Sequence, residues 1–165
     1  MPTLEQTNQQ TANLYWLAFL LTGQHETSVD AAVEALESAD GNAYFSAWML
    51  AWARKVVIAK ALGAIRQELA ASAVRLASVR GRNCPAPPRN WALAPGASKV
   101  QLERALLAID TLPRCVLLLS LFEGFSIDDA TILLDVDREV ARKAQAFALH
   151  ELTRNLAAMP EAARV

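Results

Sequence analysis

Cysteine and histidine are scarce in this chain of 165 residues, which holds two of each. Cys84 and Cys115 lie far apart without a C-x-x-C pair or a neighbouring histidine, so neither a zinc site nor a disulfide framework is predicted. His25 and His150 are single, and no nucleophile pattern or Gly-rich phosphate loop accompanies them. We therefore expect a protein of a reducing compartment that has no metal or cofactor and is not an enzyme.

Long hydrophobic runs are also missing. No run reaches the roughly 18 apolar residues of a membrane span, and the opening MPTLEQTNQQ lacks the basic start and apolar core of a signal peptide. We expect a cytoplasmic protein. Hydrophobic residues make up 53% and charged residues 20% of the chain, which suits packed cores and excludes the disordered and fibrous classes.

Strand signals are absent, and helical spacing takes their place. The first helical pattern ends at Thr22 and Gly23, as a C-cap would, and its apolar positions are Leu14, Leu17, Ala18 and Leu21. The second starts with Ser28 as N-cap, and its buried face is predicted at Val29, Ala32, Val33 and Leu36. The third starts near Asn42, runs past Glu68, and has an apolar stripe at Phe45, Trp48, Met49, Trp52, Val56 and Ala59.

The middle of the chain differs from both ends. GRNCPAPPRNWALAPG holds four prolines and two glycines in 16 residues, which excludes a continuous helix or central strand. Residues 71–100 carry five basic and no acidic side chains, whereas both flanking parts are net acidic. The basic residues, which could follow nucleic acid or keep a tether soluble, are Arg75, Arg80, Arg82, Arg89 and Lys99. We predict a domain at 1–74, a linker at 75–97 and a domain at 98–165.

The C-terminal part is predicted to be helical as well. Ser98 caps a helix through Ile109, a turn follows at Thr111 to Pro113, and RCVLLLSLFEGF forms a short apolar helix broken at Gly124. FSIDDATILLDVDREVARKAQAF then has the outline of a helix-turn-helix. The predicted fold class is all-α, with two small bundles joined by the Pro-rich linker.

The order of these motifs resembles that of RNA polymerase sigma factors of the extracytoplasmic-function type. The segment from Leu102 to Ala144 is similar to their fourth conserved region, in which an LP turn, an apolar helix, an EGFS motif and an LGVSxExVRxR helix succeed one another. LYWLAFLLTG, DAAVEAL and FSAWMLAWARKVVIAKALGAIR resemble successive parts of the second region. Asp135 stands where the family has the turn glycine, so it must adopt the turn's dihedral angles through strain or through the tolerance of Asp for left-handed backbone.

The resemblance implies binding to core RNA polymerase and promoter DNA, with a possible anti-sigma factor as regulator. Polymerase contact is assigned to the acidic face Asp30, Glu34 and Glu37. Promoter bases would stack on Tyr44, Trp48 and Trp52. Backbone or base contacts are assigned to Arg54, Lys55, Lys60 and Arg66, and, at the start of the second helix of the helix-turn-helix, to Arg138, Arg142 and Lys143.

Each assignment has an alternative in the residues themselves. The charged groups could form solvated faces, and the spacing of Trp48 and Trp52 favours burial against the first two helices. Ala144 and Phe147 occupy positions that are usually Arg in the family, and the C-terminal part is acidic. A sigma-shaped interaction module that has lost promoter recognition, and binds an anti-sigma factor or a second copy of itself, is therefore the second hypothesis.

Overall fold

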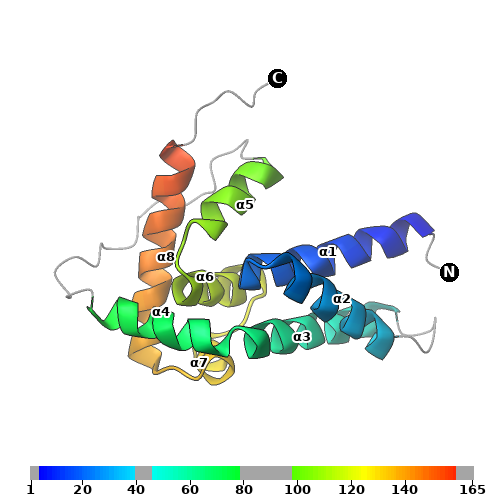
Figure 1. Cartoon of the computed structure of the whole chain (residues 1–165), viewed down its shortest axis with the longest axis horizontal. Coiled ribbons are helices and arrows are strands. Elements are labelled where there is room, and N and C mark those ends of the chain that lie inside the picture. The colour runs from blue at the N-terminus through cyan, green and yellow to red at the C-terminus, as the bar shows by residue number, and fades with distance from the viewer. Residues whose placement is uncertain (1–3, 40–45, 79–97, 159–165) are drawn as a thin grey trace. The chain divides into compact units, whose positions relative to one another are not determined.

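The computed structural model describes residues 4–39, 46–78 and 98–158, and these residues form helices joined by short turns, without a strand (Figure 1). The chain divides into two compact units, Met1–Arg66 and Gln67–Val165. The all-α prediction is confirmed. The predicted linker residues Arg80, Arg82 and Arg89 lie outside the described residues.

The first unit contains α1 (Leu4–Thr22), α2 (His25–Ala39) and α3 (Ser46–Ala64), and each of these helices packs on the other two. Helix α1 ends as the sequence predicts: Gly23 has a φ of +69°, and its amide donates to the carbonyl of Phe19 at 2.7 Å. All four apolar positions predicted for α1 are buried.

Helix α2 differs from the prediction. It begins at His25, so Ser28 lies inside it, buried, where its hydroxyl bonds with the Gln24 carbonyl and, at 3.1 Å, with Thr22 Oγ1. The buried apolar positions are Ala31, Ala32 and Ala35, whereas Val29 and Val33 are 38% and 47% exposed. Of the predicted face, Ala32 is buried and Leu36 half-buried, but the prediction was wrong for the two valines, because small side chains let this helix approach its neighbours closely and the larger valines are left outside.

Helix α3 differs from the prediction as well: of its predicted apolar stripe, Trp52 and Ala59 are exposed and Val56 is half-buried, while Phe45 and the side chains of Trp48 and Met49 lie outside the described part of the chain. Its buried positions are Ala53, Val57, Ile58, Ala61 and Leu62, and Ile65, directly after the end of the helix, is also buried. Trp52 is 47% exposed, so the prediction that it packs against the first two helices was wrong. Apolar residues occur on every side of α3, and its periodicity therefore does not select one face. The helical run is interrupted at Ile65 before α4 (Arg66–Ser78) begins.

Helix α4 reaches into the part of the chain predicted as linker, and residues from Gln67 onward belong to the second unit. The buried hydroxyl of Ser72 accepts from the amide of Leu112 at 2.9 Å. Arg75 donates from Nε and Nη2 to the two carboxylate oxygens of Asp110, at 2.9 and 2.7 Å, and from Nη2 to Glu68 at 2.7 Å. These hydrogen bonds from Arg75 hold the pKa of Asp110 below its ordinary value. Arg75 therefore has a defined structural partner instead of the free linker position that the sequence suggested.

The next two helices share a short connection. Helix α5 (Lys99–Leu107) begins with a capping box between Ser98 and Gln101, which confirms the predicted cap. Helix α6 (Thr111–Leu117) starts directly afterwards, with Asp110 as its N-cap. The turn predicted at Thr111 to Pro113 was wrong, because proline is tolerated in the first turn of a helix, where its missing amide has no intrahelical acceptor.

Helix α6 is the centre of the second unit. All seven of its residues are buried, it continues as a π-helical segment, η3 (Leu118–Phe122), and the chain then breaks at Gly124 with a φ of +74°, as predicted. Burial raises the pKa of the Cys115 thiol to about 12, so this cysteine is a packing residue. Helix α7 (Ile127–Leu134) and the long α8 (Arg138–Ala158) follow, and α8 packs against α6, α5 and α7.

Candidate nucleic-acid interface

The segment from Ser126 to Lys143 holds the most specific geometry. Ser126 caps α7 by accepting from the amide of Asp129 at 3.1 Å. Asp135 ends α7 with φ 53° and ψ 52°, so it adopts the left-handed conformation that the sequence suggested for this turn. The amide of Val136 donates to the Thr131 carbonyl at 3.2 Å, which closes the turn before α8.

The three predicted cations of α8 lie in different environments. Arg138 Nε is 3.4 Å from Asp128 Oδ1, and both side chains are mostly exposed. Arg142 is exposed one turn later, and Lys143 is half-buried. Ala144 is fully buried and packs as part of the core face of α8. Of the three cations, Arg138 is therefore partly neutralised by a carboxylate of α7.

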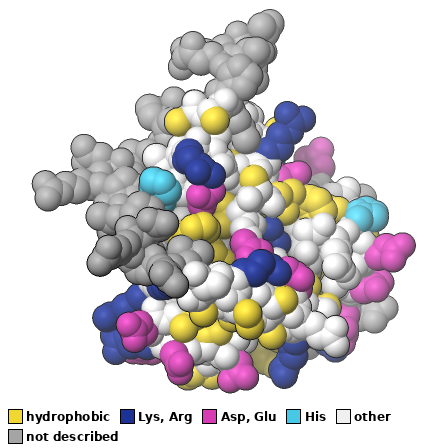
Figure 2. All heavy atoms as spheres, turned by 60° about the vertical axis from the view of Figure 1, so that its left-hand side comes forward, with side chains coloured by type: hydrophobic (Ala, Val, Ile, Leu, Met, Phe, Trp, Pro, Cys, Tyr) yellow, Lys and Arg dark blue, Asp and Glu magenta, His cyan; other side chains and the backbone are white. Residues whose placement is uncertain are grey.

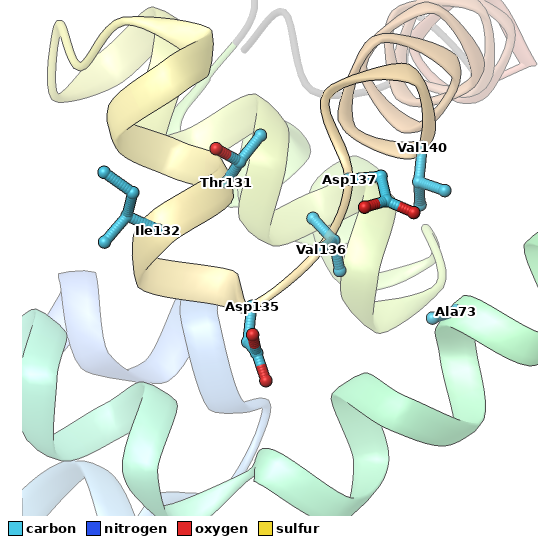
Figure 3. A pocket seen from close by; sticks show the side chains of 7 residues that line it. All are labelled: Ala73, Thr131, Ile132, Asp135, Val136, Asp137 and Val140. Atoms are coloured by element: carbon cyan, nitrogen blue, oxygen red, sulfur yellow. The ribbon is translucent and has the colours of Figure 1, made fainter.

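An open hollow of about 470 Å³ adjoins this segment (Figure 3). Asp135 points from the turn toward α4, which contributes Ala73, while Asp137 and Val140 come from the start of α8. A second hollow of about 330 Å³ shares Asp137 and Val140 and extends along α4 and α8; its other lining residues are Leu76, Ala77, Glu139 and Lys143. Sequence reasoning missed this groove because it cannot place α4 beside α8.

The first unit holds the other predicted nucleic-acid contacts. Trp52 and Lys55 are exposed on one side of α3, three residues apart, next to exposed Ala59. Arg54 is half-buried and Arg66 is exposed. Lys60 is taken up by an ion pair of 2.7 Å with Glu34. Tyr44 and the side chain of Trp48 lie outside the described part of the chain.

The predicted polymerase-binding face lies on α2. Asp30 and Glu34 are exposed on the side of the helix that also presents Val29 and Val33, so acidic and apolar side chains share one surface. The side chain of Glu37 is not among those described. The spacing of the three alanines at 31, 32 and 35 was the signal that could have placed the valines outside.

Charged and apolar groups also mix elsewhere at the surface, where Figure 2 shows hydrophobic side chains among acidic and basic ones. Within the described ranges no three His, Cys, Asp or Glu side chains gather as metal ligands would. None of the described helices is long and apolar enough to cross a membrane. Comparison of the chain with family models, with curated proteins and with solved structures found no match.

Proposed function

We propose that this protein is a sigma-like transcription initiation factor that binds core RNA polymerase and promoter DNA. The observation that carries the proposal is the succession of α7, a left-handed Asp135 and α8, with Arg138 and Arg142 exposed on the first turns of α8. A helix-turn-helix that reads the major groove presents its second helix in this way. The order of motifs along both units supports the same function.

The first unit would supply the polymerase contact and the opening of DNA. Its α2 surface presents the exposed valines Val29 and Val33 beside the carboxylates of Asp30 and Glu34, and Glu34 is paired with Lys60; a protein partner could cover the apolar part of this surface. On α3, exposed Trp52 beside exposed Lys55 offers a stacking surface next to a cation. Stacking of a base on an aromatic side chain contributes about 1–3 kcal/mol, which is enough to hold an unpaired base.

Charge limits the affinity. Lys60 and Arg138 are each paired with a carboxylate, and the start of α8 is flanked by Asp137 and Glu139. Few cations therefore remain for phosphates, and DNA binding by the chain alone is expected to be weak and to fall steeply with salt.

The test is replacement of Arg142 and Lys143 by alanine in the full chain. If both contact phosphate, the slope of log affinity against log salt for a fluorescent duplex falls by about two, because each lost contact removes roughly 0.9. The control replaces Arg104 and Arg154, two cations of the same unit, with alanine, and should leave the slope unchanged. Equal slopes for the Arg142/Lys143 variant and the wild type would count against DNA contact by α8.

A second function rests on a specific observation: buried Ala144 and the carboxylates around the turn make α8 a poor phosphate-binding surface. In this reading the protein keeps a sigma-like shape and binds an anti-sigma factor or a second copy. Co-purification of the tagged chain with core polymerase separates the two functions, since only the initiation factor requires that complex. A chain that never co-purifies with core polymerase favours the interaction module.

A further inference from the structure

The two hollows beside the α7–α8 turn form one groove, because Asp137 and Val140 line both. One wall is α4, which contributes Ala73, Leu76 and Ala77 and no charged side chain. The other wall is the turn and the start of α8, where Val136 and Val140 supply further apolar surface. Ile132, at one end, is 78% exposed. The groove thus has apolar side chains on both walls, mixed with polar ones, and is open to solvent.

The edge of the groove is mostly acidic. Asp135, Asp137 and Glu139 are exposed carboxylates within five residues of chain, and Lys143 is the cation among the lining side chains. These carboxylates point away from the core, since all three residues are exposed, and so they remain available to a ligand. An apolar groove with an acidic edge is complementary to a chain segment that has an apolar row and a basic row.

Other occupants fit less well. Phosphates would be repelled by the three carboxylates. An isologous contact with a second copy would place these carboxylates against their own equivalents. A small molecule would find little enclosure, because residues on the lining, such as Ile132 and Asp135, are themselves exposed.

We propose that this groove, between α4 and the α7–α8 turn, is a docking site for a cationic amphipathic helix of another protein. The apolar row of that helix lies along Ala73, Val136 and Val140, and its lysines or arginines pair with Asp135, Asp137 and Glu139. The proposal does not depend on binding of promoter DNA or polymerase, and it stands whichever function of the preceding subsection holds.

The test uses the full chain and a short fluorescein-labelled helical peptide of leucine, lysine and alanine, with the leucines along one side. Binding is measured by fluorescence anisotropy, and the position of the peptide by backbone amide shifts in NMR spectra. We expect saturable binding that moves the amides of Ala73, Val136 and Val140. The same peptide with glutamate for every lysine, or serine for every leucine, should bind at least tenfold more weakly.

The variant that tests the edge is Asp137→Asn with Glu139→Gln, which removes two charges and preserves shape; Asn also keeps the capping ability of residue 137. Loss of two exposed ion pairs should weaken peptide binding about threefold to tenfold. The matched control is Glu103→Gln with Glu151→Gln, which removes the same charge from the same unit and should leave the affinity unchanged. Circular dichroism verifies that both variants keep their helical content.

Several results would overturn the proposal. These are no saturable binding of the lysine peptide, equal weakening in both charge variants, or equal binding of the glutamate peptide. Shifts of the groove amides on addition of duplex DNA, in a chain that does not bind the lysine peptide, would assign the site to nucleic acid instead. Concentration-dependent dimerisation that is lost in the Asp137/Glu139 variant would assign it to a second copy.

Discussion

Asp135 is the only non-glycine residue with a positive φ among those whose backbone the structure describes. A side chain in the left-handed region ordinarily costs roughly 1–2 kcal/mol, and aspartate is one of the few residues that tolerate it. The resemblance implied this special backbone position, because Asp135 stands where the similar sequences have the glycine of the turn. It could not show that the same carboxylate points into a groove.

The strain at Asp135 can be measured by substitution. Asp135→Val should lower the free energy of unfolding by about 1–2 kcal/mol, because a β-branched side chain is poorly accommodated at φ 53°. Asp135→Gly should change it by less than about 1 kcal/mol, since relief of strain is offset by greater freedom of the unfolded chain. Urea titrations give these values. Glu139→Val, on ordinary helical backbone, is the control, and an equal loss there would show that the cost is not conformational.

Helices were easier to predict than the faces they bury. Caps and breaks at Gly23, Ser98 and Gly124 follow from local chemistry, and the structure confirms all three. The faces of α2 and α3 depend on which neighbour covers them, and a helix that is apolar on every side, such as α3, does not indicate that choice. The position of α4 could not be predicted at all, because its partners are about 35 to 40 residues away in sequence.

Helix α4 supplies a hydrogen-bond acceptor to the start of α6, and the contribution of this bond to stability can be tested at Ser72. Ser72→Ala removes the acceptor of the Leu112 amide at a fully buried position, which should destabilise the second unit by about 1–3 kcal/mol. Ser78→Ala is the control, because the Ser78 hydroxyl is exposed and bonds only within α4, to the carbonyl of Arg75. Urea unfolding followed by far-UV circular dichroism makes the comparison. Equal stability of the two variants would mean that water replaces the lost acceptor.

At the scale of the whole chain, the compact units do not coincide with the pieces that the Pro-rich segment separates. Helix α4 precedes that segment in sequence yet belongs to the second unit. Trypsin is expected to cleave at Arg80, Arg82 or Arg89, since proline-rich sequence disfavours regular structure there. After cleavage α4 is part of the N-terminal fragment, and its residues Ser72 and Arg75 still bind the C-terminal fragment.

The two fragments should therefore elute together in size-exclusion chromatography under native conditions and separate in urea. Ser72→Ala combined with Arg75→Ala should separate them without urea, because the hydrogen bonds from α4 to Leu112 and Asp110 at the start of α6 are lost. Wild-type fragments that separate immediately after cleavage would show that these contacts are too weak to hold α4 once the chain is cut.

The bond between Ser72 and Leu112 also has a consequence for biosynthesis. Helix α4 emerges from the ribosome before the helix it completes, because the two residues are 40 positions apart. The start of α6 cannot gain its acceptor until the intervening chain has been translated and closed as a loop, at an entropic cost that grows slowly with loop length. Helix α4, the beginning of the second unit, therefore waits for residues translated later, and during that interval it is available to chaperones.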